Sequence, residues 1–170
     1  MTQVTVDGAA SIKQAFAQFP SGVAAFSAMV GFAPEALVAS SFTVGVSLEP
    51  PLVMFAVQNS STTWPKLRRA PRLGVSILAQ GQEAVCLQLS SRTQDRFAGL
   101  ATSTSDAGAV LIDGAALVLE CEVVSETPAG DHAIVVLEVK SVEINHDAEP
   151  LIYHGPGSGN WPRELGRGPN

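Results

Sequence analysis

Short apolar runs separated by turn residues constrain the fold of this 170-residue chain more than any other feature. Leu52–Val57 (LVMFAV) is the most strand-like of these runs. Ala116–Val124 and His132–Ile144 are two further strong β runs, and the turn Pro128–Asp131 joins them. Apolar runs of this kind, bounded by Gly and Pro, are typical of β-strands, and two of them joined by a turn predict a β-hairpin.

Weaker signals complete the set of expected elements. Strands are expected at Val23–Val30, Arg72–Leu78 and Val110–Ile112, and over Ala36–Leu48 as a strand pair or one bent strand with a kink or bulge at Gly45. Short helices are expected at Ser11–Phe19, Ser61–Arg69 and Gln80–Ser90, the first capped by Ser11 and lying on the barrel. Many strands with few helices favour a mainly β fold, an antiparallel barrel with short covering helices. The lack of GxGxxG argues against a Rossmann domain.

The composition indicates which kinds of partner this chain can bind. Hydrophobic residues make up 46% of the chain and charged residues 15%, so part of the surface is expected to be covered by a second subunit in a homodimer. The formal net charge is −6 and basic runs are absent, which argues against a nucleic-acid partner. One local basic group, suited to a small phosphorylated ligand, comprises Lys66, Arg68, Arg69 and Arg72.

Cys86 and Cys121 form no CxxC pair, and the three histidines do not join them at metal-ligand spacing. We therefore expect two buried free thiols, rather than a disulfide, and no metal site. The first residues lack a signal-peptide pattern and no apolar run reaches membrane-spanning length, so a cytoplasmic protein without a membrane partner is expected.

The sequence offers few groups for direct catalysis. GxSxG, HExxH and P-loop motifs are absent, and the carboxylates are scattered. An enzyme of this composition would take its reactivity from a cofactor.

Two hydroxyl-rich segments stand out, Ser40–Thr43 (SSFT) and Asn59–Thr63 (NSSTT). The second follows the strand Leu52–Val57 and precedes a predicted helix. Hydroxyls and unpaired backbone amides at a helix start form a site for anions. The alternative is that Asn59–Thr63 is only a helix N-cap, because Ser, Thr and Asn are common there.

An ordered series of motifs then links these segments. The series comprises Phe19–Val23 (FPSGV), Ser40–Thr43, Val46–Val53 (VSLEPPLV), Asn59–Thr63, Asp95–Gly99 (DRFAG), Gly130–His132 (GDH) and Pro150–His154 (PLIYH). In order and spacing it resembles the flavin reductase-like family, FMN-binding split-barrel proteins that include the reductase components of two-component flavin monooxygenases. The resemblance covers about residues 10–154 and implies a split β-barrel fold.

The resemblance also implies positions for a bound flavin, FMN or FAD. The SFT segment lies beside the isoalloxazine ring in such proteins, which points to Ala39, Ser40, Ser41 and Thr43. The NSSxT segment holds the ribityl phosphate, which points to Asn59, Ser60, Ser61 and Thr63. This second assignment agrees with the anion site inferred from the residues themselves.

Two further residues, Arg96 and His132, each have two possible roles. Arg96, from DRFAG, lies near the flavin phosphate or adenylate by resemblance, or else forms a surface ion pair with Asp95 or another carboxylate. His132, from GDH, lies near the nicotinamide by resemblance, where it would orient the hydride donor rather than protonate it. The alternative for His132 is a hydrogen-bonded structural residue at the start of a strand.

The implied function is a flavin reductase that transfers a hydride from NADH or NADPH to FMN or FAD and supplies reduced flavin to a partner monooxygenase. Ser40 and Val38 stand where common members carry Asn and Thr, so a second hypothesis is a flavin- or deazaflavin-binding protein without reductase turnover. The expected domain spans residues 10–154, and residues 155–170 form a Gly/Pro-rich tail.

Overall fold

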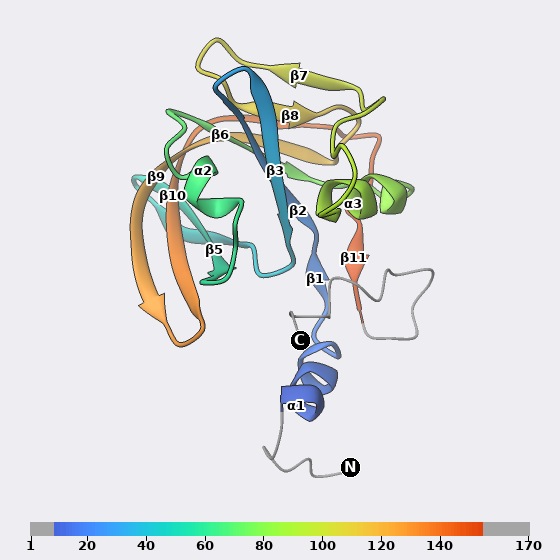
Figure 1. Cartoon of the computed structure of the whole chain (residues 1–170), viewed down its shortest axis with the longest axis vertical. Coiled ribbons are helices and arrows are strands. Elements are labelled where there is room, and N and C mark those ends of the chain that lie inside the picture. Colours follow the sequence, from blue (N-terminus) through green and yellow to red (C-terminus); the bar gives the residue numbers. More distant parts are fainter. Residues whose placement is uncertain (1–8, 155–170) are drawn as a thin grey trace.

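One antiparallel sheet of seven strands forms the body of the molecule (Figure 1), in the order β3-β2-β6-β9-β10-β5-β4. The computed structural model describes residues 9–154. The strands are β2 (Ala24–Val30), β3 (Ala33–Ala39), β4 (Thr43–Leu48), β5 (Pro51–Gln58), β6 (Leu73–Ile77), β9 (Leu117–Ala129) and β10 (His132–Ile144). The sheet curves strongly and β3 and β4 form its two edges, which gives the expected mainly β, antiparallel split barrel.

Small elements surround this sheet. They are the strand pairs β1 (Ser21–Gly22) with β11 (Ile152–Tyr153) and β7 (Thr102–Thr104) with β8 (Val110–Ile112), and the helices α1 (Ala9–Phe16), α2 (Trp64–Leu67) and α3 (Glu83–Ser90). None of the helices within residues 9–154 has the length and apolar character needed to cross a membrane.

Strand β2 is buried on both faces, which explains its apolar sequence AAFSAMV. Ala24 and Phe26 face the barrel interior, where the Phe26 and Phe55 rings stack with centroids 4.0 Å apart. Ala25 points to the opposite side and joins a second core that includes Cys86 and Leu89 of α3. Two cores back to back therefore hold the β2 side of the sheet.

Strand β8 lies against the outer face of β2 and β6 through two buried serines. Ser27 Oγ donates to the Val110 carbonyl oxygen at 3.0 Å, and the Ile112 N–H donates to Ser76 Oγ at 2.9 Å. Gly74 makes this approach possible, because a Cβ atom there would lie 1.9 Å from the Val110 carbonyl oxygen. Both buried hydroxyls are satisfied, as buried polar groups need to be.

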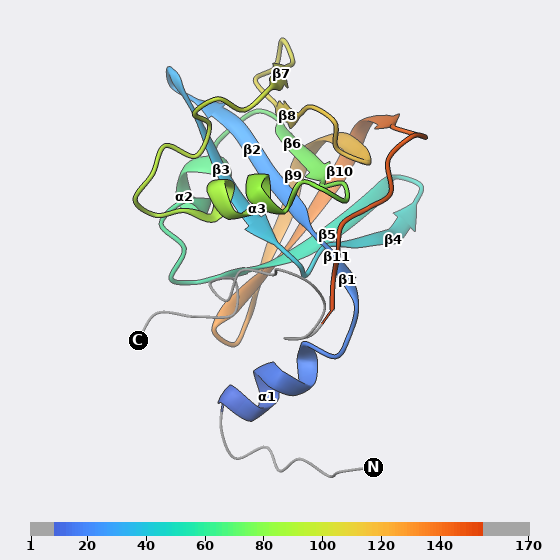
Figure 2. The same ribbon diagram turned by 90° about the vertical axis from the view of Figure 1, so that its right-hand side faces the viewer.

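The first predicted helix is correct in kind but wrong in its limits and its place. It begins at Ala9, so Ser11 lies inside it and is not its N-cap. It does not lie on the barrel: α1 stands away from the sheet in both views (Figures 1 and 2). Phe16 and Phe19 are accordingly 74% and 76% exposed.

Two other helices are shorter than predicted. The segment Ser61–Arg69 contains only the single turn Trp64–Leu67, with Pro65 in its first turn as expected. Gln80–Ser90 becomes helical only from Glu83, because Gln82 Oε1 accepts the Ala79 N–H at 2.9 Å and closes a turn ahead of the helix.

The segment Ala36–Leu48 is neither one strand nor a strand pair, because β3 and β4 lie at opposite edges of the sheet. The chain between them crosses the end of the barrel, where the Phe42 ring packs edge-on against Phe26. The predicted bulge at Gly45 is confirmed: its φ is +71° and the register shifts between Thr43 and Ser47.

The predicted strands Val23–Val30, Leu52–Val57 and Arg72–Leu78 are confirmed as β2, β5 and β6 within a residue or two. The final hairpin is also confirmed, but β9 continues beyond Val124 to Ala129, so Pro128 lies within it and the turn narrows to Gly130-Asp131. Cys86 and Cys121 are free and buried, as expected, and burial raises the pKa of their thiols to about 11 and 12. The tail 155–170 lies outside the described residues.

Candidate functional site

The carboxyl end of β5 is the corner at which the predicted site residues meet. Asn59–Thr63 continues the chain directly from β5. Ser41 is hydrogen-bonded to the same strand, and His132 lies beside it on β10, paired with Gln58. Residues distant in sequence are therefore brought to one corner by the order β10-β5-β4.

Ser41 is fixed to β5 by two hydrogen bonds. Its Oγ accepts the Ala56 N–H and donates to the Ala56 carbonyl oxygen, each at 3.0 Å. Ala39 ends β3, paired with Ala24, and Thr43 starts β4, paired with Met54. Ser40 is exposed between them. All three hydroxyls are exposed, but that of Ser41 is bound to the backbone, so Ser40 and Thr43 carry the hydroxyls without a partner among the described residues.

Asn59 joins the loop after β5 to the β9–β10 hairpin. Its side-chain Nδ2 donates to the Gly130 carbonyl oxygen at 3.1 Å, and its backbone N–H donates to the Asp131 carbonyl oxygen at 2.9 Å. The Asn59 amide therefore holds the hairpin that carries His132, and its predicted contact with a phosphate stays a prediction.

Ser60, Ser61 and Thr62 form the open part of the loop. Ser61 Oγ accepts the Trp64 N–H at 3.1 Å, so it supplies the hydrogen bond that starts α2. The backbone N–H groups of Ser60 and Thr62 have no acceptor among the described residues. Because α2 is only four residues long, an anion here would be bound by these hydroxyls and amides and not by a helix dipole.

Arg96 closes the other end of the loop. Its Nη1 donates to Thr63 Oγ1 at 3.0 Å and to the Ala36 carbonyl oxygen at 2.5 Å, and its Nε donates to the Ser91 carbonyl oxygen at 2.6 Å. The alternative of an ion pair with Asp95 is wrong, because Asp95 Oδ1 instead accepts the Phe97 N–H at 2.9 Å. Arg96 thus ties Thr63, β3 and the segment after α3 together.

A polar hollow of about 320 Å³ opens beside Thr62 and Thr63. Its other lining residues come from β3, α2 and the segment after α3: Pro34, Glu35, Lys66, Ser91, Arg92, Gln94, Asp95, Arg96 and Phe97. Only Lys66 of the predicted basic group lines it. Arg68 instead pairs with Glu126 and Arg72 with Glu120 and Glu122, so that group does not form one phosphate site.

His132 forms a close pair with its neighbour in the hairpin turn. Its Nδ1 lies 2.7 Å from Asp131 Oδ1, and this hydrogen bond lowers the pKa of the Asp131 carboxyl. The imidazole is partly exposed, with 35% of its side-chain surface accessible. His132 is therefore oriented by Asp131 and still open to a ligand.

The sequence did not predict that Trp64, Glu126 and Glu35 contribute to this corner. Trp64 is buried against Phe55 and donates its indole N–H to Glu126 at 3.2 Å, which anchors α2 to β9. Glu35 binds Lys66 across the hollow at 2.5 Å. Contacts between residues this far apart in sequence have no periodic signal, so sequence patterns could not have found them.

Fold and site together define a class: an antiparallel split-barrel protein with a hydroxyl-rich loop, Asn59–Thr63, directly after the end of one strand. The model of the flavin reductase like domain matches residues 16–162 of this chain. The chain belongs to that family.

Similar proteins support this assignment. A flavin reductase of Pseudomonas putida is 35% identical over 144 residues, 85% of each chain. The reductase component of 4-hydroxyphenylacetate 3-monooxygenase from Thermus thermophilus is 36% identical over 143 residues, 84% of this chain and 90% of that one. The solved NADH:FAD oxidoreductase of Streptomyces globisporus, in complex with NAD and FAD fragments, is 30% identical with a TM-score of 0.84, covering 91% of this chain and 93% of its own.

Proposed function

We propose that this protein is a flavin reductase, which transfers a hydride from NADH or NADPH to FMN or FAD and delivers reduced flavin to a partner monooxygenase. The observation that carries the proposal is the meeting of Ser41, the loop Asn59–Thr63 and His132 near the end of β5. Relatives named as flavin reductases and as monooxygenase reductase components support it.

The residues present fit a flavin phosphate. The loop offers the hydroxyls and free amides of Ser60 and Thr62, and it contains no carboxylate that would repel an anion. Lys66 at the adjoining hollow adds a cation. Because few fixed charges contact the ligand, affinity stays modest, which suits a flavin that must leave after reduction.

Bound flavin would supply the hydride acceptor. The protein's own work is then to hold the two nucleotides in reacting geometry and to exclude water. We propose that Ser40 and Thr43 contact the ring end of the flavin and that His132, held by Asp131, orients the nicotinamide. No general acid is required for the hydride step, so His132 acts by position.

The second hypothesis, a flavin- or deazaflavin-binding protein without reductase turnover, was based on two residues that differ from the family pattern, Val38 and Ser40. Val38 packs into the outer core with Cys86 and Leu89, so its change from Thr concerns packing in this structure. The second hypothesis therefore depends on Ser40 alone, and we favour the reductase.

We retain the domain division at residue 154 as part of this proposal. We also propose that the protein is cytoplasmic, because a reducing compartment suits the free thiols of Cys86 and Cys121.

A second copy of the chain is proposed to cover the outer face of β5 and β10. Val53, Phe55 and Val57 point into the barrel, so the alternate residues face outward. The outward residues form an apolar strip: Leu52, Met54, Ala56, Ile134 and Val136. An apolar strip on the outer face of a sheet is suited to burial in a homodimer.

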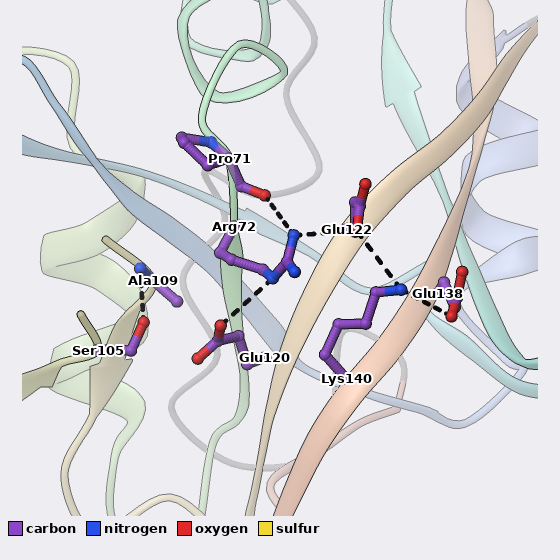
Figure 3. Close-up of polar contacts among 8 residues, drawn as sticks. All are labelled: Pro71, Arg72, Ser105, Ala109, Glu120, Glu122, Glu138 and Lys140. Carbon is purple, nitrogen blue, oxygen red and sulfur yellow. Dashed lines mark hydrogen bonds and ion pairs between the residues drawn. The ribbon is translucent and has the colours of Figure 1, made fainter. Parts of the chain in front are cut away.

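Ion pairs join Arg72 to β9 and β9 to β10 (Figure 3), and one of their members, Glu138, is paired with Leu52 at the end of the strip. Arg72 bridges Glu120 at 3.4 Å and Glu122 at 2.9 Å, and Lys140 bridges Glu122 at 3.4 Å and Glu138 at 2.7 Å. Exposed pairs of this kind contribute little to folding stability. They instead give the proposed interface a polar rim.

Anaerobic mixing of the purified protein with excess FMN or FAD and either NADH or NADPH tests the reductase proposal. We expect bleaching of the flavin absorbance, at a rate proportional to protein concentration, with at least one nucleotide. Bleaching no faster than in a protein-free control, with all four combinations, would rule out the reductase and leave flavin binding as the function to examine.

A further inference from the structure

Glu126 is a charged residue on the interior face of the barrel. On β9 it is paired with Val135 of β10, and Val135 is paired with Phe55 of β5. Residues paired across neighbouring strands point to the same face, and both Val135 and Phe55 are buried in the interior core. The Glu126 side chain is only 25% exposed. A carboxylate on an apolar face costs free energy unless other groups bind it, so its binding partners indicate its role.

Among the described residues, two bind this carboxylate, and both follow the loop Asn59–Thr63. The Trp64 indole N–H donates to Glu126 Oε2 at 3.2 Å, and Arg68 Nη1 lies 3.3 Å from the same oxygen. Trp64 is the first residue of α2, and Arg68 is its C-cap. Trp64 is buried, whereas the Arg68 side chain is half exposed, so we expect the hydrogen bond to Trp64 to be the stronger of the two contacts.

Trp64 connects Glu126 to the loop. Its ring packs edge-on against Phe55, with centroids 5.3 Å apart, and its backbone N–H donates to Ser61 Oγ at 3.1 Å. Because Glu126 and Phe55 fix the indole, they also fix the backbone of Trp64 and, through it, the Ser61 hydroxyl. The middle of the loop is therefore positioned from β9.

The two ends of the loop have separate attachments. Asn59 is bonded to Gly130 in the turn between β9 and β10, and Thr63 is bonded to Arg96. The hydroxyls and amides proposed to bind the flavin phosphate lie between these ends. Loss of the Glu126 carboxylate should therefore loosen the middle of the loop without detaching its ends.

We infer that Glu126 is a positioning residue for the flavin phosphate, which acts through the Trp64 indole and the Ser61 hydroxyl and does not touch the ligand itself. The inference depends on the proposed function, because it requires that the loop Asn59–Thr63 binds the phosphate. A residue that acts at the phosphate end alone changes the affinity for FMN and leaves the affinity for riboflavin, which lacks the phosphate, unchanged.

The test measures dissociation constants for FMN and riboflavin by fluorescence titration. Glu126→Ala should weaken FMN binding about three- to tenfold and change riboflavin binding by less than about twofold, because it removes one hydrogen bond that positions the loop. Glu126→Gln retains an oxygen that accepts the indole N–H, so its FMN affinity should stay within about twofold of the wild-type value. A role of the charge itself would not be rescued in this way.

Glu122→Ala is a matched control on the same strand. Glu122 pairs with Arg72 and Lys140 and not with α2, so its loss should leave both affinities within about twofold. Trp64→Phe is a second test of the same contact, because it keeps a ring against Phe55 but lacks the indole N–H. It should reproduce the selective loss of FMN affinity, so the inference can be tested even if Glu126→Ala does not fold.

Unchanged FMN affinity in Glu126→Ala or Trp64→Phe, equal losses for FMN and riboflavin, or a loss in Glu126→Gln as large as in Glu126→Ala would overturn the inference. A wild-type protein that binds FMN no more tightly than riboflavin would contradict the proposed phosphate loop and the inference with it. A wild-type preference for FMN that Glu126→Ala leaves unchanged would contradict the inference alone.

Discussion

At the scale of single residues, the site is held together by side chains that bind the protein's own backbone. Ser41, Asn59 and Arg96 were all predicted as ligand contacts, yet each donates to or accepts from main-chain groups of another segment. The sequence assigned these polar residues to one site, and their contact with a ligand stays a prediction. It could not assign their roles, because the hydrogen-bond partner of a polar side chain depends on the tertiary structure.

His132→Ala is the first prediction at this scale. The variant should slow flavin reduction by about 10- to 100-fold, because misplaced reactants lose reacting geometry. Stopped-flow reduction gives the hydride-transfer rate, and fluorescence titration gives the flavin dissociation constant, which should change by less than about threefold. If flavin affinity falls more than the rate, His132 belongs to the flavin pocket itself.

Asn59→Ala should act through the same histidine. Loss of the 3.1 Å bond to the Gly130 carbonyl removes one of the two bonds by which Asn59 holds the hairpin turn before His132, so the KM for NADH should rise and the reduction rate should fall. In the double variant with His132→Ala, the two losses in rate should be less than additive. Full additivity would show that Asn59 acts independently of His132.

At the scale of elements, runs with a clear pattern were predicted well. The strands β2, β5 and β6 and the final hairpin were read from continuous apolar runs and turn residues. The helices were predicted less well. Helix α2 has only one turn, and the apolar residue Phe16 of α1 is exposed and does not pack on the barrel. Strand β7 was not among the predicted strands, because its sequence TST has no apolar residue and the strand depends on pairing with β8.

Gly74→Ala tests the packing of β8 on β6. The added methyl group would lie 1.9 Å from a backbone oxygen, so the free energy of unfolding should fall by about 3 kcal/mol. Gly22→Ala is the control, because a methyl group added at Gly22 would have no atom within 4 Å. Urea denaturation measures both, and similar stability of the two variants would contradict the close approach described for β8.

At the scale of the whole molecule, the barrel fold can be predicted from the apolar runs along its strands. The position of the apolar surface that the fold leaves exposed cannot be predicted in this way. The low fraction of charged residues predicted that a second subunit covers part of the surface, but it did not predict which part. Only the pairing of β5 with β10 places Met54 beside Val136 and Ala56 beside Ile134 on one outer face.

Val136→Lys should convert a dimer into monomers, because it would bury an unpaired charge at the proposed interface. Val142→Lys is a control on the same strand, exposed and outside the strip. Sedimentation velocity measures the assembly state. A wild-type monomer, or a Val136→Lys dimer as stable as the wild type, would show that this face is not the interface.

The loop Asn59–Thr63 is proposed to hold the flavin phosphate, and the affinity difference between FMN and riboflavin tests this central assignment directly. The wild-type protein should bind FMN much more tightly than riboflavin, which lacks the phosphate. Ser61→Asp sets a carboxylate against that phosphate and should abolish the preference while riboflavin affinity changes little. An unchanged preference for FMN in Ser61→Asp would contradict the assignment and place the phosphate elsewhere.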